Sequence, residues 1–71
     1  MIEEKFNPVV IRVLTQNIRR DDLLYFRNME GVLNVSHTHH GNQRVVILHI
    51  KDDKRITLRY DEKITVMRLQ P

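Results

Sequence analysis

The feature that most constrains this 71-residue chain is a hairpin whose two halves agree in register. Two segments rich in β-formers, residues 32–39 and 44–51, flank the pair Gly41–Asn42, which is typical of a two-residue hairpin turn. A turn at this pair sets Val35 opposite Leu48 and puts the strongest apolar residues of both segments on one side. The same register pairs Leu33 with Ile50, Asn34 with His49, and Ser36 with Ile47. The pattern therefore predicts a half-buried antiparallel sheet.

The length of the chain predicts one domain with a small core, which is only marginally stable on its own. We expect residues 1–8 to form a polar arm that ends at Pro8, and residues 9–71 to form the domain. The chain contains no cysteine, which excludes disulfides and thiolate metal sites and fits a reducing compartment. Self-association is then the expected source of additional burial.

The first residues carry two acids and no long apolar run, so they do not resemble a secretory signal. The longest uninterrupted apolar run has four residues, far too few to span a membrane. We therefore expect a cytoplasmic protein. Its 12 Lys and Arg against 9 Asp and Glu give a net charge of +3, which permits polyanion binding without requiring it.

Together with the hairpin, the remaining patterns predict one helix and five strands. Residues 9–14 are rich in β-branched side chains and predict a first strand. Residues 18–29 predict a helix with a broad apolar stripe, capped by Asn17 or Asp21 and ended by Gly31. The other strands are expected at about 32–39, 44–51, 55–60 and 64–69. The order is β-α-β-β-β-β, and the helix is the only available cover for the sheet, so we expect an α+β fold with one helix packed on a mostly antiparallel sheet.

Some pairings remain open at this level. A three-residue loop at 52–54 keeps one face apolar, and it sets Ile50 opposite Ile56, Leu48 opposite Leu58, and Val46 opposite Tyr60. The turn at 61–63 allows two registers for the last strand. The first strand either lies at an edge, parallel to the second, or inserts beside the third as in half of a ferredoxin-like fold. The Glu30–Gly31–Val32 segment resembles the helix-to-strand connection of small ferredoxin-like domains, and the resemblance carries no function.

The solvent side of the predicted sheet combines aliphatic, polar and cationic residues. Val45 and Ile47 would lie there side by side, which a small monomer usually avoids. The expected contact surface comprises Val45, Ile47, His49, Thr57 and Arg59. It predicts a non-catalytic interaction module, a homo-oligomeric accessory or regulatory protein that docks on a protein partner.

A second hypothesis is a basic nucleic-acid-binding accessory protein. Its phosphate contacts would come from Arg12, Arg19, Arg20 and Arg59. Sheets that bind single strands normally present aromatic side chains for stacking, and the predicted solvent face has none. Self-association is therefore preferred.

Histidine chemistry is the third hypothesis. His37 and His39 share one side of a strand, as two metal ligands would, but His49 lies on the other face, so a third ligand would have to come from another subunit. Catalysis is not expected, because the chain has no cysteine, a single serine (Ser36) and no glycine-rich phosphate loop. We predict neither an enzyme nor a cofactor.

Overall fold

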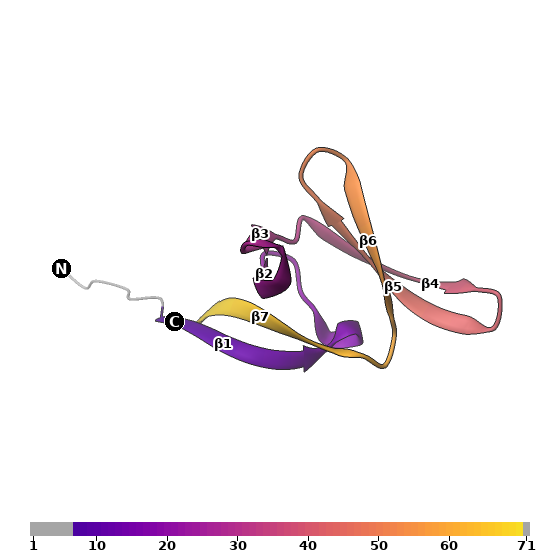
Figure 1. Ribbon diagram of the computed structural model, residues 1–71, viewed down its shortest axis with the longest axis horizontal. Coiled ribbons are helices and arrows are strands. Elements are labelled where there is room, and N and C mark those ends of the chain that lie inside the picture. The colour runs from indigo at the N-terminus through magenta and orange to yellow at the C-terminus, as the bar shows by residue number, and fades with distance from the viewer. Residues whose placement is uncertain (1–6, 71) are drawn as a thin grey trace.

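Residues 7–70, as described by a computed structural model, form two antiparallel sheets (Figure 1). The first sheet has the strand order β1-β7-β2-β3, and the second has the order β4-β5-β6. The strands are β1 (Asn7–Leu14), β2 (Leu23–Leu24), β3 (Glu30–Gly31), β4 (Asn34–His40), β5 (Gln43–Ile50), β6 (Lys54–Arg59) and β7 (Lys63–Gln70). Asn7 and Pro8 already belong to β1, and the rest of the expected polar arm, residues 1–6, lies outside the described residues.

The predicted β4–β5 hairpin is confirmed from Asn34 onward, but the predicted pairing of Leu33 with Ile50 is absent from the ladder, and Leu33 is 55% exposed. His40 pairs with Gln43 across the turn, and Val35 pairs with Leu48 as expected. Gly41 has a φ of +61°, which fits a two-residue turn with glycine at its first central position. The hairpin extends away from the rest of the molecule, with its turn at the far right of Figure 1.

The predicted register between β5 and β6 is wrong by two residues. Leu48 pairs with Ile56, and Ile50 pairs with Lys54, so the loop is Lys51–Asp53 instead of 52–54. Asp52 and Asp53 take the left-handed backbone conformation, which aspartate tolerates better than most residues. Because a shift of two keeps every side chain on its own face, the predicted division into an apolar and a polar face survives.

The predicted helix over 18–29 is wrong, and with it the α+β fold class. Within residues 7–70 the helical segments are two 3-10 turns of three residues, η1 (Thr15–Asn17) and η2 (Tyr25–Arg27). Leu23–Leu24 instead forms β2, which pairs with both β3 and β7. Left-handed backbone at Asn28 and Met29 interrupts any helical run. None of the helical segments described is long and apolar enough to cross a membrane.

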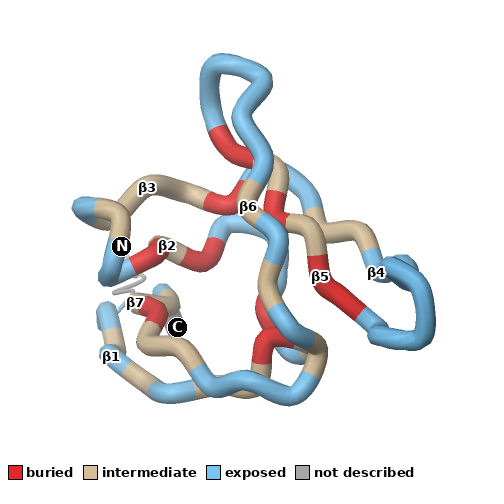
Figure 2. Tube along the Cα trace, turned by 45° about the vertical axis from the view of Figure 1, so that its right-hand side comes forward, coloured by how far each residue is buried: buried red, intermediate tan, exposed pale blue. Residues whose placement is uncertain are grey.

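Neither predicted place for the first strand is right, because β1 pairs antiparallel with β7 along its whole length. β7 leaves the predicted meander and enters the other sheet, so it has no register with β6 to choose. Nor is the arrangement half of a ferredoxin-like fold, since each sheet covers the other in place of a helix. The buried residues lie where the two sheets face each other (Figure 2). They are Ile18, Leu24, Val32, Val46, Leu48, Ile50 and Val66.

Candidate functional site

The face predicted as a contact surface exists, but its aliphatic residues are largely covered. Val45 lies in the central strand β5 between Thr38 and Arg59, and only 6% of it is exposed. Ile47 lies between Ser36 and Thr57 and is half-buried. The predicted pair of exposed aliphatic residues is therefore absent from this face.

Two of the five exposed large apolar residues among residues 7–70, Val10 and Leu69, lie on the outer face of the first sheet, and the other three, Tyr25, Phe26 and Leu33, lie outside its strands. Val10 of β1, Met67 of β7 and Leu23 of β2 pair directly with one another and form one row across three strands. The row next to it in register, Ile11, Val66 and Leu24, faces the core. Val10 is 53% exposed, and Leu69, opposite Pro8 in the same sheet, is 60% exposed. We call Val10, Leu23, Met67 and Leu69 the outer apolar face.

The arginines proposed for phosphate binding do not form one group in the structure. Arg12 is exposed on the outer side of β1, and Arg19 and Arg20 follow η1. Arg59 ends β6, where its carbonyl oxygen accepts a hydrogen bond from the Thr15 hydroxyl. The partner of Arg59 in a surface hollow is a residue that the sequence did not single out, Arg44.

This hollow, of about 290 Å³, is lined by Gln43, Arg44, Arg59, Tyr60 and Asp61. The Arg44 guanidinium carbon lies 3.9 Å from the centre of the Tyr60 ring, a cation–π contact. The backbone N–H of Tyr60 donates to the Arg44 carbonyl oxygen at 3.2 Å. The register expected from the sequence pairs Tyr60 with Val46, two residues away from the observed register. It therefore does not predict the contact between Arg44 and Tyr60.

The histidines lie at the edge of the same region. The rings of His37 and Tyr60 meet edge to face, with their centres 5.7 Å apart. His39 is exposed and pairs with Arg44 in the ladder. Among residues 7–70 no three His, Cys, Asp or Glu side chains come together in a way that could hold a metal ion.

One serine–histidine contact is present on the polar side of the second sheet. The Ser36 hydroxyl and His49 Nε2 lie 3.0 Å apart. The ladder places Asn34 and Arg55 on the two sides of His49, where an acid would be needed to orient the imidazole for catalysis. The contact therefore serves as a hydrogen bond that partly covers His49.

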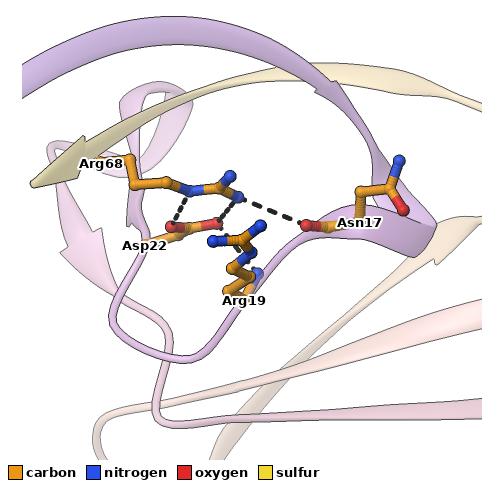
Figure 3. Close-up of polar contacts among 4 residues, drawn as sticks. All are labelled: Asn17, Arg19, Asp22 and Arg68. Atoms are coloured by element: carbon orange, nitrogen blue, oxygen red, sulfur yellow. Dashed lines mark hydrogen bonds and ion pairs between the residues drawn. The ribbon is translucent and has the colours of Figure 1, made fainter. Parts of the chain in front are cut away.

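The most buried charged group among residues 7–70 is the Asp22 carboxylate, which joins the loop before β2 to strand β7 (Figure 3). Arg68 donates to it twice, from Nε to Oδ1 at 2.9 Å and from Nη2 to Oδ2 at 2.7 Å. The backbone N–H of Arg19 donates to the same Oδ2 at 2.9 Å. Arg68 Nη2 also reaches the carbonyl oxygen of Asn17 at 3.3 Å.

The hydrogen bond to Asp22 raises the pKa of Arg68 above its ordinary value, against the opposing effect of burial. Because the pKa of Arg68 is raised in the folded state, loss of the Arg68 charge would weaken the pair only in strong alkali. Arg68 is thus a structural cation at neutral pH, and its charge is already compensated by Asp22.

The chain matches no protein-family model, and no significant similarity to a curated protein or a solved structure was found. The described residues offer two candidate binding surfaces, the outer apolar face and the hollow beside Tyr60.

Proposed function

We propose that this protein is a non-catalytic interaction module that self-associates through strand β1. The observation that carries the proposal is the edge of the first sheet, where β1 pairs with β7 on one side and with no other described strand. An open edge presents unpaired N–H and C=O groups that can pair with another chain. Arg12 is the only charged residue in β1.

The other sheet edges are less suited to pairing. β6 carries three cations among its six residues, and charged side chains are a common protection of edge strands. β4 is polar and holds three histidines, and β3 is only two residues long. β1 is therefore the edge strand best suited to pair with a second strand.

The composition of β1 favours a second copy of the chain as its partner. Two antiparallel β1 strands can pair about a two-fold axis, which makes the interface self-complementary. Pro8 has no N–H, so the segment able to pair runs from Val9 to Leu14. When even-numbered residues oppose even-numbered ones, the outer apolar faces of both copies lie on the same side of the joined sheet.

The small core supports the same conclusion. Eight apolar residues are buried in the described part of the chain, six of them fully, which is little burial for an independently stable domain. Continuing the sheet into a second copy would cover Val10 and satisfy the edge of β1. We further propose that the dimer acts in the cytoplasm as an accessory or regulatory protein, with the rest of its outer apolar face open to a protein partner.

The test compares Val10→Lys with Thr57→Lys by sedimentation velocity over a range of protein concentrations. Both residues are exposed, so neither change disturbs the core. Val10→Lys puts a cation into the pairing edge, and we expect it to yield monomer at concentrations where the wild type is dimeric. Thr57→Lys lies on the polar face of β6 and should leave the dimer intact.

Two outcomes would contradict the proposal. A wild-type chain that stays monomeric at all accessible concentrations would exclude self-association. A dimer that resists Val10→Lys and dissociates with Thr57→Lys would move the contact to the face of Val45, Ile47 and His49. Circular dichroism of each variant confirms that the fold is retained.

A further inference from the structure

The surface hollow beside Tyr60 brings together two arginines from different strands and an aromatic ring. Arg44 is the second residue of β5, Arg59 ends β6, and Tyr60 follows Arg59 directly. Gln43 and Asp61 complete the lining. We call this set the Tyr60 hollow. It lies beside the turn of the projecting β4–β5 hairpin (Figure 1), where Gln43 pairs with His40.

The contacts of Tyr60 hold one guanidinium in a defined orientation. Arg44 lies over one face of the ring at 3.9 Å, and the edge-to-face contact with His37 fixes the ring from another direction. A guanidinium placed in this way is a planar group with a second face and several N–H donors. Such a plane can stack on a flat ligand while its rim donates hydrogen bonds.

The charge of the hollow is not balanced by its own residues. Within residues 7–70 neither Arg44 nor Arg59 lies within ion-pair distance of a carboxylate, although Asp61 is part of the lining. By contrast, Arg68 and Arg27 both have a carboxylate partner. Arg44 and Arg59 therefore have donors to spare for an anionic ligand.

We propose that the Tyr60 hollow binds single-stranded nucleic acid and holds one nucleotide of a longer strand. A base stacks on the free face of the Arg44 guanidinium, which RNA-binding proteins use in the same way as aromatic rings. Arg59 contacts a neighbouring phosphate, and the Gln43 amide is available to a base edge. The predicted sheet face has no aromatic side chain for stacking, and the Arg44 guanidinium would take that role.

The size and shape of the hollow favour a strand over a small molecule. Its volume of about 290 Å³ lies just below the usual range for pockets that enclose small ligands, roughly 300–1,000 Å³. The hollow is also open at the surface, so a chain can enter and leave it. Duplex is disfavoured, because its bases are already stacked on one another and cannot reach a guanidinium plane.

The experiment measures binding of fluorescein-labelled 12-nucleotide single strands, DNA and RNA, by anisotropy at low salt, with a duplex of the same sequence alongside. We expect Arg44→Ala to weaken single-strand binding by on the order of tenfold, the size expected from losing one stacked base. Arg55→Ala is the matched control, because Arg55 is also an exposed arginine of β6 but lies outside the hollow. It should weaken binding less than threefold.

A second pair of variants separates stacking from charge. Arg44→Lys keeps the charge and loses the plane, so it should resemble Arg44→Ala. Tyr60→Phe keeps the ring and should bind like the wild type. The dimer-interface variant Val10→Lys should bind with unchanged affinity per chain, which keeps this proposal separate from self-association.

Several results would overturn the proposal. These are no single-strand binding at low salt, equal losses for Arg44→Ala and Arg55→Ala, and wild-type affinity for Arg44→Lys. Preference for the duplex would also overturn it. Displacement of the strand by a phosphoserine peptide at concentrations as low as those of unlabelled strand would assign the hollow to phosphorylated protein instead.

Discussion

Valines that face away from the core differ in exposure between the two sheets. Val10 and Val45 both face away from the core, yet Val10 is 53% exposed and Val45 is 6% exposed. Val45 lies in a central strand, with Arg59 on one side and Thr38 on the other. Val10 lies in the edge strand, with Met67 on one side only. The exposure of an outward-facing valine is thus set by its cross-strand neighbours as much as by its face.

The ties within the first sheet show a similar contrast. Asp22 and Arg68 form a two-pronged, nearly buried pair that spans most of the chain. Arg27 and Glu30 form a local pair at 3.5 Å, in which one buried carboxylate oxygen of Glu30 has no hydrogen bond. The Asp22 carboxylate of the first pair accepts two hydrogen bonds from Arg68 and one from the Arg19 N–H. The second pair is a single, longer contact next to a 3-10 turn.

The largest effect should come from breaking the buried pair. Asp22→Ala leaves the Arg68 guanidinium and the Arg19 N–H without their acceptor, and we expect a loss of about 3 kcal/mol in the free energy of unfolding. Glu30→Ala removes only the loose pair and should cost less than about 1 kcal/mol. Urea unfolding followed by circular dichroism measures both. Equal losses would show that the two pairs do not differ as their geometry indicates.

A second change tests the protection of the β6 edge. Lys54→Thr combined with Arg55→Val removes two of its three cations, and should make β6 as open to pairing as β1. We expect additional self-association, strengthened by on the order of tenfold, or about 1.4 kcal/mol. Sedimentation velocity should show species larger than a dimer. An unchanged profile would mean that charge is not what keeps this edge unpaired.

The smallest effect concerns the β4–β5 turn. Gly41→Ala should cost about 1 kcal/mol, because Gly41 has a φ of +61°. The space around it is open, so the cost is backbone strain alone. Asn42→Ala, the neighbouring change, should be nearly neutral. Thermal unfolding of both variants provides the measurement, and a neutral Gly41→Ala would show that the turn relaxes.

The parts of the fold that could be predicted are those fixed by neighbours in sequence. The Gly41–Asn42 turn sets the β4–β5 register locally, and alternation kept the faces of β6 right even though its pairing was off by two residues. The loop between β5 and β6 was predicted wrongly because its left-handed residues are Asp52 and Asp53. Such positions are usually expected at glycine or asparagine.

The parts that could not be predicted depend on distant residues. The segment Leu23–Phe26 has four apolar residues in a row, a pattern that fits a helix and a buried strand equally well. The strand at Leu23–Leu24 is established by the pairing of Leu24 with Val66 of β7, which is distant in sequence. The candidate sites followed the same rule. The outer apolar face required the β1–β7 pairing, and the Tyr60 hollow required the corrected β5–β6 register.

The pairing of β1 with β7 also has a consequence for how the chain is made. Asn7 lies opposite Gln70, so β1 is made long before β7, its only described neighbour. Until β7 has been made, β1 is exposed on both edges, whereas the β4–β5 hairpin can close as soon as it emerges. Nascent chains growing on one messenger therefore have an opportunity to pair through β1 before each has folded alone.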